Sequence, residues 1–225
     1  MKLLTILIIG IVIAAATMIS GCLWKEESYT SEYNFEVNLD TTKVQENLVL
    51  FTPLPKINGS PFVNESEFLE EANIPEGWNC EYIETEHGVM LKIEIERLEV
   101  DQYEEITLRI VSESRIDTKN ALGNEPIISP VYNLTEDEYK EYNDEPYPER
   151  YDDQIKYYRY DSYVYVENLT ENSELNIYLH HMGTNEWWVL GWIGNEYRNR
   201  LYTPSLINEG WHEVKTDLVQ GWGNY

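Results

Sequence analysis

Short runs in which apolar and polar residues alternate dominate the chain after residue 32. Residues 33–39, Tyr-Asn-Phe-Glu-Val-Asn-Leu, alternate without a break, which is the two-residue period of a strand buried on one face. Similar patterns predict further strands at residues 47–52, 82–86, 90–96, 106–110, 157–160, 163–168, 175–181, 187–193, 197–202 and 211–218. The chain is therefore predicted to be all-β.

The strand count and the scarcity of helical patterns favour an antiparallel β-sandwich of about ten strands with one or two short helices. One helix is predicted over residues 64–72, where Asn64 can cap the first turn and Glu67 completes a capping pattern. The helix is expected to end before Pro75. Strands, rather than helices, are expected to build the core.

Two neighbouring strand patterns, at 90–96 and 106–110, are the clearest in the chain. Their apolar residues share one predicted face, which comprises Leu91, Ile93, Ile95, Ile106, Leu108 and Ile110. The short polar link at Asp101-Gln102 predicts that the two strands pair as a hairpin, Met90–Val111, with Glu94 opposite Arg109. This hairpin is expected to be part of the stable core.

Residues 117–153 interrupt the alternating pattern. They contain several prolines and a dense acidic run from Glu136 to Asp153. Thr135 and Glu138 form a second capping pair, which predicts one or two helical turns at 136–142. The segment is either a boundary between two domains or a long surface excursion of one. Because neither half alone has a complete set of strands, we expect residues 33–225 to form a single β-sandwich-like domain.

Aromatic residues gather toward the C-terminus. Five of the seven tryptophans lie there, namely Trp187, Trp188, Trp192, Trp211 and Trp222. On a strand at 186–193, Trp188 and Trp192 point one way and Trp187 points the other. An exposed face of these rings suits a sugar, whose apolar C–H faces can stack on them, so the five tryptophans are candidate ligand-binding residues. The alternative is a well-filled sandwich core, since aromatic side chains bury large areas.

The N-terminus differs in kind from the rest of the chain. Lys2 precedes a run of apolar and small residues, 3–19, which ends in Ile19-Ser20-Gly21-Cys22. A charged start, an apolar stretch and small residues before a cut site are typical of an export signal. The last four residues resemble the lipobox of secreted lipoproteins, with Ile where Leu is commonest. The resemblance implies that residues 1–21 are removed as a signal peptide and that Cys22 is lipidated and begins the mature chain.

The alternative is that residues 3–19 stay in the membrane as an uncleaved anchor, although 17 residues are at the short end of what crosses a hydrocarbon core of about 30 Å. Either way, the remainder is expected outside the cell, on the outer face of the cytoplasmic membrane. Residues 22–32 are then a lipidated N-terminus and a polar tether. Because two lipid chains hold firmly where one binds reversibly, the resemblance implies a diacyl-type modification.

The charge of the chain limits its partners. A net charge of −25 disfavours nucleic acid, because binding it depends on neutralising phosphates with Lys and Arg. The same charge repels an anionic membrane surface, so the lipid anchor is expected to hold the protein on the membrane. Carbohydrate and envelope proteins are the remaining candidate partners.

No residue pattern predicts a metal site, a cofactor or a catalytic centre. His180 and His181 are adjacent on a predicted strand, so they leave opposite faces and are badly placed to chelate one ion. The acidic run lacks the ordered spacing of a calcium loop. With Cys22 lipidated, Cys80 has no partner for an internal disulfide and is expected to be a small buried residue. The nucleophile elbow, the phosphate-binding loop and the dinucleotide fingerprint are absent from the sequence.

Four N-glycosylation sequons begin at Asn58, Asn64, Asn133 and Asn168. In an exported chain these asparagines can accept glycans, and they are expected on surface loops or turns.

Taken together, these features favour an extracytoplasmic, membrane-anchored lipoprotein that is a non-enzymatic binding or interaction module of the cell envelope. The alternative is a tethered hydrolase acting on envelope polysaccharide or peptide. A cleft with two carboxylates about 5–10 Å apart beside exposed aromatic side chains would favour the hydrolase.

Overall fold

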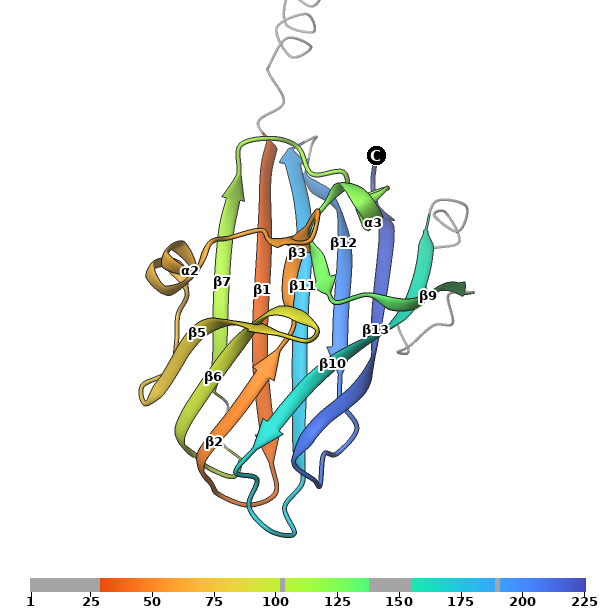
Figure 1. Cartoon of the computed structure of the whole chain (residues 1–225). Coiled ribbons are helices and arrows are strands. Elements are labelled where there is room, and N and C mark those ends of the chain that lie inside the picture. Colours follow the sequence, from red (N-terminus) through yellow and green to blue (C-terminus); the bar gives the residue numbers. More distant parts are fainter. Residues whose placement is uncertain (1–28, 102–103, 138–154, 189–190) are drawn as a thin grey trace, which may run out of the picture.

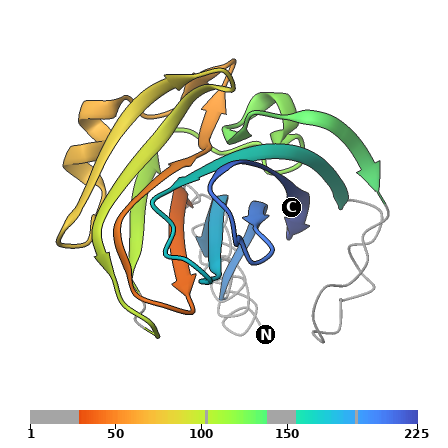
Figure 2. The same cartoon turned by 60° about the horizontal axis from the view of Figure 1, so that its bottom comes forward.

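The computed structural model describes residues 29–101, 104–137, 155–188 and 191–225. Nine antiparallel strands follow one another in one curled sheet, in the order β5-β6-β2-β10-β13-β12-β11-β1-β7 (Figure 1). The sheet folds over along β10 and β13, so that its two halves face each other as layers (Figure 2). The predicted all-β, antiparallel sandwich is confirmed, and both of its layers belong to one continuous sheet.

The front layer in Figure 1 consists of β2 (Gln45–Thr52), β5 (Trp78–Thr85), β6 (Gly88–Leu98) and β10 (Lys156–Glu167). The back layer consists of β1 (Tyr29–Thr41), β7 (Glu105–Ser112), β11 (Leu175–Trp188), β12 (Trp192–Tyr202) and β13 (Gly210–Gly223). A further strand, β9 (Tyr132–Asp137), pairs with the N-terminal part of β10. A small second sheet contains β3 (Leu54–Ile57), β4 (Ser60–Pro61) and β8 (Ile127–Ser129).

The apolar core lies between the two layers. Alternation along β1 turns Phe35, Val37 and Leu39 inward, where each is at most 2% exposed. From the front layer, Leu50 and Ile93 meet them in the same cluster of buried residues. Fully burying such a side chain contributes about 1.5–3 kcal/mol. The residues that the alternation predicts to face inward therefore hold the two layers together.

The predicted hairpin Met90–Val111 is wrong in its pairing. Strand β6 pairs with β2 and β5 in the front layer, whereas β7 pairs with β1 in the back layer. Glu94 consequently forms an ion pair with Lys92, and Arg109 forms one with Glu32. The connection after β6 thus carries the chain from one layer to the other. The facing is correct, because the apolar residues of both strands point into the shared core, and of the six only Ile110 is half-buried.

The predicted helix at 64–72 is confirmed as α2 (Glu65–Glu71). The Asn64 side chain accepts a hydrogen bond of 3.0 Å from the backbone N–H of Glu67, and Phe68 is buried in the core. The helix lies beside β5 and β7, at the two ends of the curled sheet (Figure 1). After it, Asn73 bridges to Thr107 of β7, so this segment covers the open side of the sandwich.

The predicted helical turns at 136–142 are wrong where they can be compared. Glu136 and Asp137 belong to strand β9, and residues 138–142 lie outside the described residues. The other short helix among the described residues is α3 (Ala121–Asn124). Within the described ranges, neither helix has the length and apolarity needed to cross a membrane.

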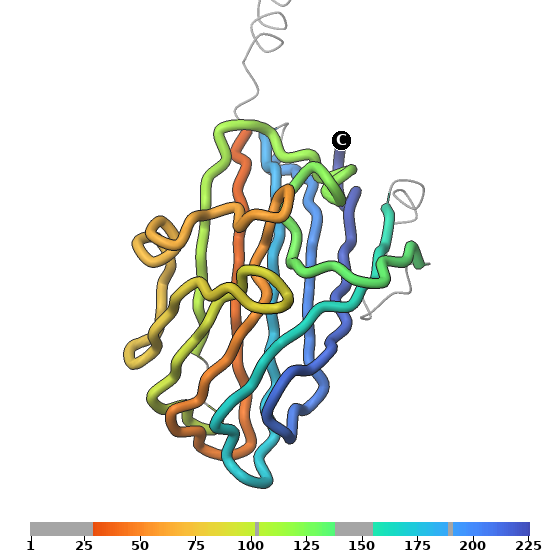
Figure 3. Tube along the Cα trace, viewed as in Figure 1, coloured from red at the N-terminus to blue at the C-terminus, as the bar shows by residue number. Residues whose placement is uncertain are grey.

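Residues 113–131, between β7 and β9, cross the inner surface of the back layer near the end where β1 begins (Figure 3). Buried side chains of the sheet bind the backbone of this covering segment. Asn185 accepts from the N–H of Ile116 at 3.0 Å and donates to its carbonyl at 2.9 Å. Asn199 accepts from the N–H of Ile128 at 2.6 Å. These amides satisfy the backbone N–H groups of Ile116 and Ile128, which would otherwise be buried without a partner.

Candidate functional site

The end of the β11–β12 hairpin carries three of the candidate tryptophans. The predicted strand at 187–193 is wrong, because β11 ends at Trp188 and β12 begins at Trp192. Trp188 and Trp192 lie opposite each other across the hairpin, with ring centroids 5.7 Å apart and exposures of 55% and 65%. Trp187 faces the other way, as predicted, and is only 8% exposed. One of these rings is therefore structural and two are open to a partner.

The remaining two candidate tryptophans lie elsewhere. Trp211, at the start of β13, belongs to a cluster of contacting rings around the junction of β13 with β10 of the front layer. The cluster, called the front-layer cluster below, comprises Phe51, His87, Tyr132, Tyr163, Tyr165 and Trp211. Trp222 lies under the Arg198 guanidinium, 5.2 Å from the ring centroid. The structure thus separates the five candidates into three places and does not form one binding face from them.

The adjacent histidines point in opposite directions, as the strand period predicts. His181 is fully buried on the inner face, where its ring contacts the carbonyls of Asn34 and Pro126 and the Tyr197 hydroxyl at 2.9–3.0 Å. Burial lowers the pKa of His181 to about 3, so the ring is neutral. His180 points to the outer face of the back layer. The two rings have separate surroundings and do not share a ligand.

A pocket of about 340 Å³ surrounds His180 on this outer face, and it is lined by Glu36, Asn38, Glu105, Tyr178 and His180. Strand pairing brings these residues together from three strands. On β1, Glu36 lies opposite His180 of β11 and Asn38 lies opposite Tyr178. On the other side of β1, Asn38 lies opposite Glu105 of β7. We call this the His180 pocket.

The imidazole of His180 is held neutral and is incompletely hydrogen-bonded. Burial, with a smaller contribution from Arg200 and Arg198, lowers its pKa to about 4. Its Nδ1 lies 3.7 Å from a Glu36 carboxylate oxygen, which is too long for a hydrogen bond and, with a neutral ring, is not a salt bridge. Its Nε2 is buried and has no hydrogen-bond partner among the described residues. An unsatisfied buried nitrogen can be accommodated by a ligand or a water molecule.

Two carboxylates share the pocket with His180. Burial and the nearby charge of Glu105 raise the pKa of Glu36. Glu36 and Glu105 are diagonal neighbours in the register of β1 and β7, a relation that separates residues by about 7–8 Å. Perturbed titratable groups that gather in one pocket are typical of functional sites.

One exposed tyrosine, Tyr178, lines the pocket, and its ring lies against that of Tyr202. Tyr178 and Tyr202 lie opposite each other on β11 and β12, with centroids 4.6 Å apart. They are 42% and 51% exposed, and a hydrogen bond with Tyr202 raises the pKa of Tyr178. The pocket therefore combines an apolar ring surface with hydrogen-bonding groups beside it, which is the composition of a small-molecule site.

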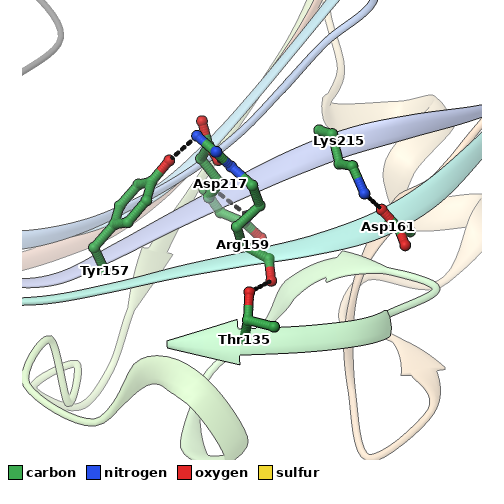
Figure 4. A network of polar contacts seen from close by, with 7 residues as sticks. Thr135, Tyr157, Arg159, Asp161, Lys215 and Asp217 are labelled. Atoms are coloured by element: carbon green, nitrogen blue, oxygen red, sulfur yellow. Dashed lines mark hydrogen bonds and ion pairs between the residues drawn. The ribbon is translucent and has the colours of Figure 1, made fainter. Parts of the chain in front are cut away.

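A second polar cluster, on the outer face of β10 and β13, has its charges paired internally (Figure 4). Arg159 donates to Asp217 at 3.0 Å and to the Tyr157 hydroxyl at 2.7 Å. Lys215 pairs with Asp161, which is almost fully buried. Lys215 and Asn133 lower the pKa of the Asp161 carboxyl. These contacts join β9 to the front layer, so this cluster is structural.

All four sequon asparagines are exposed. Three of them use their side chains: Asn64 caps α2, Asn133 donates to Asp161 at 2.7 Å, and Asn168 donates to the carbonyl of Asn47 at 3.0 Å. Asn58, in the turn before β4, makes no side-chain hydrogen bond within the described residues. A glycan at Asn58 would consequently disturb the fewest contacts.

Cys80 on β5 is half-buried and packs against the core. Burial raises the pKa of its thiol to about 12, so the thiol does not ionise at neutral pH and is a poor nucleophile. Among the residues that the structure describes, no three His, Cys, Asp or Glu side chains are grouped so as to hold a metal ion.

The sequence patterns did not identify the residues of the His180 pocket as a site. The alternation of residues 33–39 assigns Glu36 and Asn38 to the polar face of their strand, and the same logic assigns His180 and Tyr178 to one face of another. Only the pairing of β1 with β11 and β7 brings them together.

A scan against protein-family models and searches of curated proteins and of solved structures found no match to this chain.

Proposed function

We propose that this chain is an extracytoplasmic, lipid-anchored protein of the cell envelope that binds a neutral carbohydrate in the His180 pocket. The observation that carries the ligand class is the exposed Tyr178–Tyr202 ring pair beside the unpartnered Nε2 of His180. A sugar ring offers an apolar face for stacking and hydroxyl groups at its edge for the polar side chains.

The polar groups of the pocket favour a neutral ligand. Glu36 and Glu105 accept hydrogen bonds, Asn38 both donates and accepts, and the neutral His180 ring can do either. Two carboxylates on a chain of net charge −25 repel phosphates and acidic sugars. Hydroxyl groups, which donate and accept without carrying charge, match this set.

The N-terminal sequence supports the location. Residues 3–19 read as an export signal, and the ending Ile19-Ser20-Gly21-Cys22 resembles the lipobox of secreted lipoproteins. Intact mass of the protein extracted from membranes, compared with a Cys22→Ser variant, tests this part. A lipid adduct on the native chain and its loss in the variant are expected. An unmodified thiol at Cys22 of the native chain would contradict the lipid anchor.

Binding is tested on an array of neutral hexose and N-acetylhexosamine oligosaccharides. Tyr178→Ala is expected to reduce the affinity for a bound oligosaccharide by at least tenfold, because the stacking ring is lost. Tyr132→Ala is the matched control, since Tyr132 is 40% exposed but lies on β9, away from the pocket. Equal affinities of the two variants would refute the assignment of the site.

The carboxylate pair favours a second candidate, a tethered hydrolase of envelope polysaccharide. Glycoside hydrolysis uses two carboxyl groups, one of them with a raised pKa, at separations of about 5–10 Å. Glu36, with its raised pKa, and its diagonal neighbour Glu105 match this requirement. Release of reducing ends from the oligosaccharides that bind, abolished by both Glu36→Gln and Glu105→Gln, would establish the hydrolase. Binding without release would establish the binding module.

A further inference from the structure

The end of the sandwich at which β1 begins is rich in exposed aromatic rings. In Figure 1, β1 starts at this end and β11 and β13 finish there. Trp188 and Trp192 are the most exposed tryptophans described, and Tyr29 and Tyr225 are each 46% exposed. We call these four residues the aromatic end. Trp and Tyr are enriched where proteins meet the interface of a bilayer, because one part of the ring system is apolar and another is polar.

Cations accompany the rings at this end. Arg115 lies 4.8 Å from the Trp187 ring centroid and Lys119 lies 3.9 Å from that of Tyr225. Arg115 and Lys119 also line a hollow of about 420 Å³, together with Asp117 and Tyr225. Of these two cations, Lys119 lies on an exposed ring, and Arg115 lies on the buried Trp187 next to the exposed Trp188. Lipid phosphates attract such side chains.

The position of this end relative to the N-terminal sequence identifies its partner. Tyr29 is separated from the apolar run at residues 3–19 by nine residues, which reach at most about 30 Å when fully extended. From a lipid on Cys22, the six residues 23–28 reach only about 20 Å. The aromatic end is thus the part of the sandwich that the chain holds closest to the bilayer.

We propose that the aromatic end rests on the membrane and inserts Trp188 and Trp192 into the headgroup region of the bilayer that holds the anchor. The inference rests on the anchoring part of the proposed function and is independent of the His180 pocket. Because the tether is short, the effective concentration of the membrane surface near these rings is about millimolar. A membrane contact that would be weak for the free protein in solution is therefore occupied in the anchored protein. The strands then stand on the membrane, and Glu36 and Asn38, seven and nine residues along β1 from Tyr29, lie about 25–30 Å above its surface.

Quenching of tryptophan fluorescence by lipids brominated on their acyl chains tests this contact. The full-length protein is reconstituted into phosphatidylcholine vesicles with and without brominated lipid, and in a second arm with phosphatidylglycerol added. Trp24→Phe is used as the parent, because Trp24 adjoins Cys22 and would be quenched by the anchor alone. Trp188→Phe/Trp192→Phe in this background is compared with Trp211→Phe, which removes a ring of the front-layer cluster.

We expect brominated lipid to quench the tryptophan fluorescence of the parent and of the Trp211→Phe variant. In the double variant, the quenched fraction of the fluorescence should be at most half of that in the parent. Equal quenching of parent and double variant would overturn the inference. The inference would also be overturned if the parent floats with the vesicles but its fluorescence is not quenched. A dimer that buries the aromatic end would give this second result. A parent that fails to float refutes the anchoring proposal itself, which distinguishes the two failures.

Discussion

The buried amide of Asn185 is predicted to be one of the most important polar groups for stability. Asn185 is fully buried on the inner face of β11 and makes four side-chain hydrogen bonds. Two join it to the backbone of Ile116 in the covering segment, and the others join it to Ser31 and Asn195. Asn185→Ala removes all four and leaves the N–H of Ile116 with no partner inside the protein, whereas the carbonyl of Ile116 still accepts from the N–H of Thr118 at 3.0 Å.

The size of the effect follows from these four bonds. Each hydrogen bond contributes about 0.5–1.5 kcal/mol net, and a buried group left unpaired costs about 1–3 kcal/mol. Some of the freed groups keep other partners, since Asn195 still accepts from Thr118 at 2.7 Å. We therefore expect Asn185→Ala to lower the free energy of unfolding by about 2–4 kcal/mol.

Urea unfolding and amide hydrogen exchange measure the two consequences separately. The matched control is Asn176→Ala on the same strand, because Asn176 faces outward and its side chain makes only two long hydrogen bonds, donating to Asp40 at 3.4 Å and accepting from Ser205 at 3.5 Å. The control is expected to change stability by less than about 0.5 kcal/mol. In Asn185→Ala, the amide of Ile116 should also exchange faster than those of the core strands. Equal stability of the two variants, or unchanged protection of Ile116, would refute the role of the amide.

Further predictions concern the core, the hairpin end and the pocket. Ile93→Ala should cost about 2–5 kcal/mol in urea unfolding, whereas Glu94→Ala, which removes only an exposed ion pair, should cost less than about 1 kcal/mol; similar costs would mean that β6 faces the other way. Trp187→Ala should lower stability by about 3–5 kcal/mol and Trp188→Ala by much less, so equal thermal midpoints of the two variants would contradict their burial. In the unfolded chain His180 takes up a proton as the pH falls below its ordinary pKa, but in the folded chain it does so only below about pH 4. Lowering the pH from 7 to 5 should therefore reduce the free energy of unfolding by about 1–2 kcal/mol through this residue. His180→Gln should make stability less dependent on pH over that range, and an unchanged dependence would show that the ring is not held neutral.

Alternation predicts which way a side chain faces but not which strand lies beside it. The inward residues Phe35, Val37 and Ile93 are correctly assigned, because a half-buried strand exposes every second residue whatever its partner. The hairpin Met90–Val111 is misassigned, because a short polar link looks the same whether it turns back in one layer or crosses to the other. The His180 pocket depends entirely on such partners, so it is visible only in the structure.

The region from Trp187 to Trp192 illustrates a second limit. An apolar run with no polar face predicts a strand covered on both sides, but here the run belongs to the ends of two strands. Trp188 and Trp192 lie on one side through pairing across the hairpin, not through alternation along a strand. Between the two strands only Gly191 is of a residue type that marks hairpins, and a lone glycine inside an apolar run did not suffice to predict the position of the turn.

The arrangement of β1 has a mechanical consequence. Each of its 13 residues is paired with β11, and residues 31–38 are also paired with β7 on the other side. If the chain is anchored at its N-terminus, a force that pulls a ligand bound in the His180 pocket away from the cell acts along the length of β1. The backbone hydrogen bonds on both sides are then sheared together and not opened one after another. Attached in this way, the domain would resist unfolding under tension at the strand that connects it to the membrane.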